Sequence, residues 1–128
     1  MKVIISGSRC ITDYNLVEEA VKLSGFDITE VVSGMAQGVD NLGIEWAHDH
    51  GIPIMPFPAD WNQHGKWAGF KRNQEMADYG DALIAVWDGT SRGTLDMINR
   101  SKLKNLPMAV FQYFPATIKP WPWHPPKA

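Results

Sequence analysis

An unbroken apolar run at residues 82–86 constrains the fold of this chain more than any other feature. The run reads Ala-Leu-Ile-Ala-Val and contains no polar residue, which is the pattern of a strand covered on both faces. Lys2–Ser6 is a second apolar, β-branched segment, and Gly7 ends it. Strands of this kind are typical of parallel sheets with helices packed on either side.

The rest of the chain alternates between helical and extended patterns. Apolar stripes of helical spacing, with glycine or capping residues at their ends, predict helices over 12–24, 39–50, 69–79 and 94–104. Strands are predicted over 28–33, 52–57, 81–87 and 107–113, and Pro53 and Pro56 place the strand over 52–57 near an edge. A polar, tryptophan-containing loop is expected over 58–68. We therefore predict an α/β, Rossmann-like three-layer domain whose mostly parallel sheet has about five strands.

The sequence divides into a domain over 1–113 and a tail over 114–128. The tail holds Pro115, Pro120, Pro122, Pro125 and Pro126, with Trp121 and Trp123 among them. Repeated proline disfavours helix and favours extended polyproline geometry. We expect an arm that packs on the domain or on a neighbouring subunit, with a peptide-recognition motif as the alternative.

Composition limits the partners and the compartment. A length of 128 residues suits one hydrophobic core, and a net charge of -2 lacks the basic excess of a dedicated duplex-DNA binder. The single cysteine fits a reducing compartment, and no segment resembles a signal peptide or a membrane span. The four histidines lack zinc-site spacing. We expect a cytoplasmic protein with no metal, no required cofactor and no membrane partner.

The loops that follow the first two strands carry groups suited to an anionic ligand. In open parallel sheets, ligands bind beyond the carboxyl ends of the strands. The first such loop offers backbone access, a hydroxyl and a guanidinium at Gly7, Ser8 and Arg9. The second leads into a helix N-terminus, whose free amides favour an anion, through Ser33, Gly34, Gly38 and Asp40. Asp40 either caps that helix or contacts a ribose hydroxyl.

The segment after the third strand adds aromatic and cationic candidates. Trp61 and Trp67 either stack on a base or anchor the core. Lys66 and Asn73 are further candidate ligand contacts, and Arg72 is the best single phosphate ligand if its helix points at the pocket. Asp60 is a candidate acid or base as well as a candidate contact.

The loop after the fourth strand has the most phosphate-like composition. It places two glycines, two hydroxyl residues and an arginine before a helix, with Asp88, Gly89, Ser91, Gly93 and Thr94 as the candidate contacts. Asp88 is the second candidate acid or base. Four such loops at one edge of the sheet predict a pocket for a phosphate-bearing ligand.

Taken together, these loops resemble the SLOG superfamily, which groups the lonely-guy phosphoribohydrolases with the DNA-processing protein A family. The resemblance is strongest to the YspA-type branch. It rests on five segments in this order, 6–9, 33–40, 58–61, 65–73 and 87–94, and covers about residues 1–112. It implies a Rossmann-like fold with a pocket for a nucleotide or ADP-ribose-like ligand, and related folds often form homo-oligomers. The resemblance also implies that Arg72 matches the arginine that follows the third strand in the phosphoribohydrolases. Likewise, Gly89, Ser91, Gly93 and Thr94 match their glycine-rich phosphate loop.

One position departs from the phosphoribohydrolase pattern. Those enzymes carry a glutamate three residues after the Gly-Thr pair, and this chain has Met97 there. A thioether cannot stabilise the oxocarbenium-like centre of N-glycosidic cleavage, and Asp96 lies about 100° around the helix. We therefore expect binding or sensing of a nucleotide-derived ligand. The alternatives are hydrolysis with Asp60, Asp88 or Asp96 in the lost role, and single-stranded DNA binding through arginines and stacking tryptophans.

Overall fold

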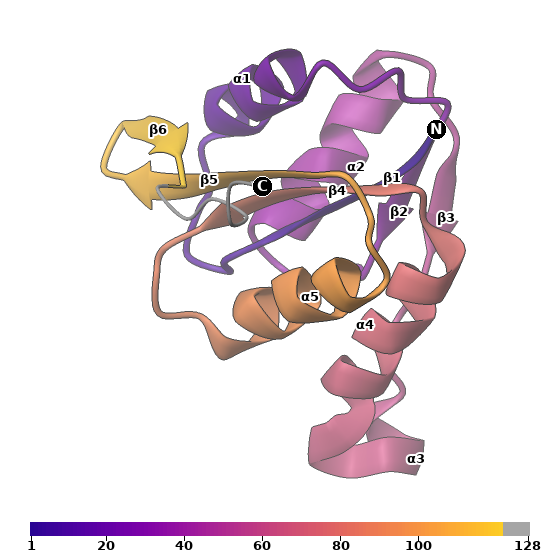
Figure 1. Ribbon diagram of the computed structural model, residues 1–128. Helices are drawn as coiled ribbons and strands as arrows, with labels where there is room; N and C mark the ends of the chain where they lie inside the picture. The colour runs from indigo at the N-terminus through magenta and orange to yellow at the C-terminus, as the bar shows by residue number, and fades with distance from the viewer. Residues whose placement is uncertain (122–128) are drawn as a thin grey trace.

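The computed structural model describes residues 1–121 and shows a sheet between two layers of helices (Figure 1). The strands are β1 (Lys2–Gly7), β2 (Glu30–Ser33), β3 (Ile54–Pro56), β4 (Ala82–Trp87), β5 (Met108–Phe114) and β6 (Thr117–Pro120). The helices are α1 (Tyr14–Ser24), α2 (Val39–Asp49), α3 (Trp61–His64), the 3₁₀ turn η1 (Gly65–Trp67), α4 (Ala68–Tyr79) and α5 (Arg92–Leu103). The sheet order is β3-β2-β1-β4-β5-β6, and only the β5–β6 pair is antiparallel.

Strand β4 lies at the centre of the fold, as its sequence predicts. All six of its residues are buried. Ala82, Ile84 and Val86 join the core cluster beneath α1 and α2, whereas Leu83 and Ala85 join the cluster beneath α4 and α5. Side chains that alternate between two apolar layers explain why the strand needs no polar face. The Rossmann-like three-layer prediction is confirmed.

The strand order places a switch point between β1 and β4. The chain runs outward from β1 to β2 and β3, and then returns to pair β4 on the other side of β1. At such a point the loops after the two central strands diverge, which leaves a crevice at their carboxyl ends. The candidate site lies in this crevice.

Two boundary predictions are wrong. The loop expected over 58–68 contains α3 and η1, because Asp60 caps α3 by accepting a hydrogen bond from the Gln63 amide at 3.0 Å. Helix α5 begins at Arg92 rather than at residue 94, because Ser91 is its N-cap. Strand β3 does lie at an edge, as its prolines predict, and it has only three residues.

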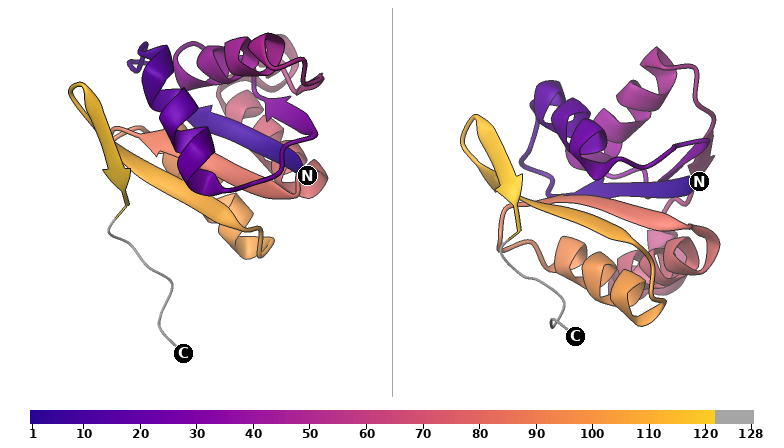
Figure 2. Two further views of the ribbon diagram at one scale, coloured as in Figure 1. Left: turned by 90° about the horizontal axis from the view of Figure 1, so that it is seen from above. Right: turned by 45° about the horizontal axis from the view of Figure 1, so that its top comes forward.

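The expected polyproline geometry is wrong over 114–120, although this part of the arm does pack on the domain. Strand β5 runs on to Phe114, the chain turns through Ala116 at φ 68°, and β6 pairs antiparallel with β5. A single proline in a turn and another at the end of an edge strand are compatible with a hairpin. The sheet therefore has six strands, and Figure 2 shows the hairpin at its edge. Pro122, Trp123, Pro125 and Pro126 lie outside the described residues.

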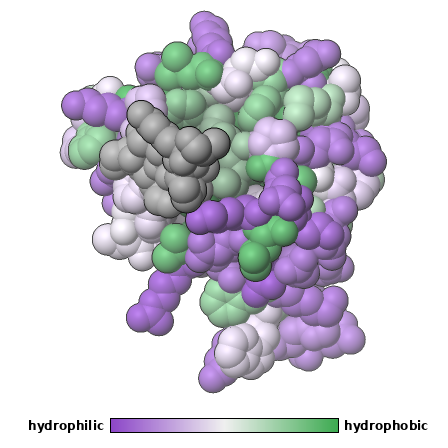
Figure 3. Space-filling view, in the orientation of Figure 1, coloured by the Kyte–Doolittle hydropathy of each residue, from purple (hydrophilic) through white to green (hydrophobic). Residues whose placement is uncertain are grey.

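The surface also bears on the expected partners. No helix in the described part of the chain has both the length and the apolar character needed to cross a bilayer. In Figure 3, hydrophilic residues cover much of the face that carries α4 and α5, and pale residues of intermediate hydropathy lie at the projecting end with α3.

Candidate functional site

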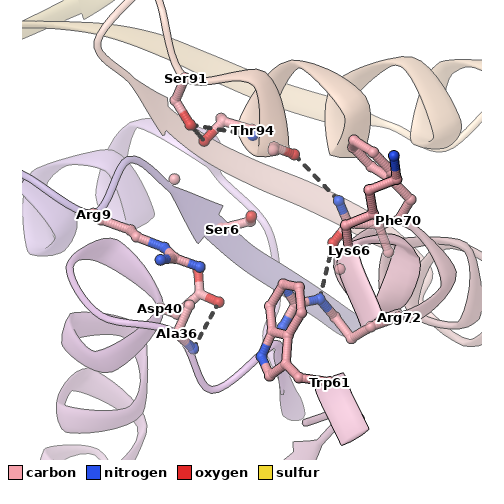
Figure 4. A pocket seen from close by; sticks show the side chains of 14 residues that line it. Ser6, Arg9, Ala36, Asp40, Trp61, Lys66, Phe70, Arg72, Ser91 and Thr94 are labelled. Carbon is pink, nitrogen blue, oxygen red and sulfur yellow. Dashed lines mark hydrogen bonds between the residues drawn. The ribbon is translucent and has the colours of Figure 1, made fainter. Parts of the chain in front are cut away.

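A cleft of about 200 Å³ opens at the carboxyl ends of β1 and β4 (Figure 4). Four segments line it, each following a different parallel strand. Predicted residues that it brings together are Gly7, Arg9, Asp40, Trp61, Lys66, Arg72, Asn73, Ser91, Gly93 and Thr94. The lining also includes Ser6, Ala36, Gly69 and Phe70, which lie in the segments that carry the family resemblance but were not predicted as ligand contacts.

Arg72 reaches from α4 to the loop after β2. Its Nη1 donates to the Gly34 carbonyl oxygen, and its Nε donates to Asn73 Oδ1 at 3.0 Å. Burial lowers the pKa of Arg72 and nearby Arg9 lowers it further, while Asp40 opposes them. The guanidinium thus has a fixed position in the cleft, with Nη2 making no hydrogen bond to any described residue.

Asn73 connects α4 to the start of α5. Its side chain is buried, and its Nδ2 donates to the Gly93 carbonyl at 3.2 Å and to Asp96 Oδ2 at 3.0 Å. Asp96 also accepts from Arg100 Nε at 2.8 Å. These bonds set the position of the first turn of α5, so Asn73 and Asp96 act in positioning that turn.

Asp40 is a buried carboxylate in the wall of the cleft. Only 4% of its surface is exposed, and its Oδ2 accepts from the Ala36 amide at 3.2 Å. Burial raises the pKa of Asp40 to about 6, although the amides of Ala36 and Gly7 and the charges of Arg72 and Arg9 act against the shift. The sequence left a capping role and a ligand contact open. The carboxylate bonds the loop before α2 rather than capping the helix, and it also faces the cleft.

The N-terminus of α5 forms the wall that continues from β4. Ser91 Oγ accepts from the Thr94 amide at 3.5 Å and lies 3.1 Å from Thr94 Oγ1, while its carbonyl accepts from Trp87 Nε1 at 3.0 Å. The other first-turn amides have no acceptor within the helix. Because Ser91, Gly93 and Thr94 line the cleft, the positive end of the helix dipole lies beside it.

Asp60 and Asp88, the candidate acids or bases, do not line the cleft. Asp60 caps α3. Asp88 Oδ1 accepts from the Thr90 and Ser91 amides at 2.9 and 2.8 Å. Burial would raise the pKa of Asp88, but these amides outweigh it and lower the pKa. Asp60 thus caps a helix and Asp88 organises a loop, and the proposed acid–base roles gain no support from their positions.

Ser8 and Ser33 are buried beneath the loops. Ser8 Oγ accepts from the Asp88 amide at 3.0 Å, which joins the loops after β1 and β4. Ser33 Oγ accepts from the Met35 amide at 3.1 Å. Each hydroxyl therefore supports the backbone from below, and neither lines the cleft.

Most glycines of these loops serve close packing. A Cβ on Gly7 would overlap the Val86 carbonyl oxygen, and one on Gly38, at φ 75°, would overlap the Ser8 carbonyl. A Cβ on Gly34 would lie 2.6 Å from Arg72 Nη1. Gly34, Gly38 and Gly89 do not line the cleft. Gly93 differs, because it lines the cleft and a Cβ there would meet no atom within 4 Å.

Met97 belongs to the core. Its side chain is fully buried in the cluster between β4 and α5. The position that carries glutamate in the phosphoribohydrolases therefore holds a packing residue here. In residues 1–121, no three His, Cys, Asp or Glu side chains gather closely enough to hold a metal ion.

Comparisons with known proteins give a family match, a similar sequence and a similar fold. The model of the YspA, cpYpsA-related SLOG family matches residues 1–64. The Gene 61 protein of Mycobacterium phage D29 is 33% identical over 120 residues, which cover 86% of this chain and 95% of that protein. The X-ray structure of DNA processing protein A (DprA) from Streptococcus pneumoniae matches 85% of this chain with a TM-score of 0.70 and 18% identity. The chain spans about half of that protein, 49%, and at this identity the likeness shows a shared fold.

Proposed function

Since the chain belongs to the YspA, cpYpsA-related SLOG family, we propose that it binds a phosphate-bearing, nucleotide-derived ligand of the nucleotide or ADP-ribose kind. The site is the cleft at the carboxyl ends of β1 and β4. One observation carries the proposal. Three cations, Arg9 from the loop after β1 and Lys66 and Arg72 from the segment after β3, line the same cleft as the N-terminus of α5.

The charge distribution supports an anionic ligand. The whole chain carries a net charge of -2, yet the cleft lining has three cations against the single carboxylate of Asp40. Positive charge gathered in a concave site attracts anions despite an acidic net charge. Guanidinium groups bond phosphate oxygens through two parallel N–H groups, and a helix N-terminus adds backbone amides. These are complementary donors for one phosphate.

Arg9 gives the cleanest test. It is exposed and makes no side-chain hydrogen bond to any of residues 1–121, so Arg9→Ala should leave the fold intact. We expect ADP-ribose or AMP to bind the wild type in isothermal titration, and Arg9→Ala to weaken binding about 10–100-fold, the value of a charge-assisted hydrogen bond.

The matched control lies on α4. Lys71 is exposed and pairs with Glu75 at 3.6 Å, outside the cleft lining, so Lys71→Ala removes one positive charge without touching the site. Equal losses of ligand affinity in Arg9→Ala and Lys71→Ala would show that only the overall charge attracts the ligand. No heat from either ligand at millimolar concentration with the wild type would overturn the proposal.

A second candidate function is cleavage of such a ligand, and Asp40 is the observation that favours it. It is the one carboxylate among the described lining residues, and a pKa of about 6 suits a general acid or base near neutrality. Incubation of AMP and ADP-ribose with wild type and Asp40→Asn, followed by mass spectrometry, separates cleavage from binding. Unchanged ligand masses with the wild type would exclude cleavage of these two compounds.

A further inference from the structure

Of the tryptophans in residues 1–121, two are buried, two are exposed, and Trp121 is partly buried against Trp87. Trp46 and Trp87 are 8% and 7% exposed and lie in the core, whereas Trp61 and Trp67 are 51% and 62% exposed. Burial in the core gives a tryptophan its usual contribution to stability. Trp61 and Trp67 are too exposed to contribute much to stability by burial. Of these two, only Trp61 lines the cleft.

The position of the Trp61 ring is set by its neighbours. Trp61 begins α3 directly after the capping residue Asp60. Its Cη2 lies 3.4 Å from the point where a Cβ on Gly69 would stand, and Arg72 Nη2 lies 3.8 Å from the same point. The ring therefore packs against the bare backbone of α4 and beside the guanidinium, as Figure 4 shows.

The size of the cleft limits what it encloses. Its volume of about 200 Å³ is below the roughly 300–1,000 Å³ of pockets that surround a drug-sized ligand. A phosphate and its sugar between Arg9, Arg72 and the α5 N-terminus would occupy such a space. The remainder of a nucleotide would then lie at the rim, where a half-exposed indole provides an apolar, planar surface.

We infer that Trp61 is the specificity-determining residue of the cleft and stacks on the planar base of a nucleotide whose phosphate the cations hold. This inference rests on the proposed function and narrows it to ligands that carry an aromatic base. Stacking on an aromatic side chain contributes about 1–3 kcal/mol per base, which corresponds to about 5–150-fold in affinity. The base is recognised by its face, so the cleft accepts more than one base.

The test compares two ligands that differ only in the base. AMP and ribose 5-phosphate are titrated against wild type, Trp61→Ala, Trp61→Phe and Trp67→Ala. Trp67 is the control because its ring lies outside the cleft lining yet contacts two lining residues, Phe70 at 6.0 Å between centroids and Lys66 Nζ at 5.4 Å from the ring centre. Its removal therefore perturbs the same wall without removing the stacking surface. We expect the wild type to prefer AMP about 5–150-fold, Trp61→Ala to abolish the preference, and Trp61→Phe and Trp67→Ala to keep it.

Ribose 5-phosphate should bind Trp61→Ala as tightly as it binds the wild type, since the cations are untouched. Equal affinities for AMP and ribose 5-phosphate in the wild type would overturn the inference and leave phosphate binding intact. A Trp61→Ala variant that loses both ligands equally would assign Trp61 a structural role, and this also overturns it. If neither compound binds the wild type at millimolar concentration, the proposed function itself fails.

Discussion

Replacement of Gly93 by alanine should stabilise the fold and weaken ligand binding at the same time. Gly93 is the second residue of α5, and its backbone φ is not in the left-handed region. A Cβ at this position meets no protein atom within 4 Å, although the residue lines the cleft. The added methyl group therefore costs nothing in packing and occupies space that the ligand needs.

The two effects have different sizes and signs. Alanine is favoured over glycine within a helix by up to about 1 kcal/mol, and less near its end, so the melting temperature should rise by about 2–5 °C. The ligand meets an extra methyl group beside the amides that hold its phosphate. Steric overpacking of this kind costs about 1–3 kcal/mol, which is about 5–150-fold in affinity.

Thermal melts followed by circular dichroism measure the first effect, and titration with AMP or ADP-ribose measures the second. A variant that melts lower than wild type would show that Gly93 packs against something, contrary to the geometry. A variant that is more stable and binds as well as wild type would show that the first turn of α5 does not approach the phosphate. Either result refutes the reasoning for this wall of the cleft.

Three further substitutions test other parts of the site. Gly7→Ala places a Cβ on the Val86 carbonyl oxygen, so urea denaturation should show a free energy of unfolding lower by about 3 kcal/mol or more. Asp40 binds its proton more tightly in the folded than in the unfolded chain, so its contribution to stability is lost as pH rises from about 4 through about 6. Between about pH 4 and pH 8, the free energy of unfolding of Asp40→Asn should therefore rise by up to about 3 kcal/mol relative to that of the wild type. Parallel profiles of the two unfolding free energies against pH would contradict this. Asn73→Asp keeps the shape of the side chain but turns an oxygen toward Asp96 Oδ2. The free energy of unfolding should fall by about 2–4 kcal/mol at neutral pH, and by less in acid, where a carboxylate of the pair becomes protonated.

Local composition was sufficient to predict the layers. The run at 82–86 is apolar at every position and is too short for a buried helix, so it favours a strand between two apolar layers. The glycine and hydroxyl residues after each strand likewise predicted where the cleft lies, because parallel strands end at the same edge. Both inferences depend on neighbours within a few residues along the chain.

The roles of individual residues depended on distant neighbours. A side chain at Gly7 would clash with Val86, which is far along the chain, whereas Gly93 faces open space. Sequence spacing cannot distinguish these two glycines. Ser6 and Phe70 line the cleft although nothing in their residue types predicts a ligand contact, and only the family resemblance of segments 6–9 and 65–73 covers them. Helix α3 did have a signal, because Asp60 stands three residues before Gln63, the spacing of a helix cap.

The buried carboxylate of Asp40 bears on the kind of ligand that suits this cleft. A bare phosphate held by Arg9 and Arg72 would face a carboxylate that is mostly ionised at neutral pH, since its pKa is about 6. A sugar hydroxyl beside the phosphate would instead donate a hydrogen bond to that carboxylate, in addition to the bond from the Ala36 amide. The cations, Asp40 and Trp61 thus complement phosphate, sugar and base in turn. Met97 is fully buried in the core and offers no group for chemistry at the sugar, which is consistent with the proposed binding role.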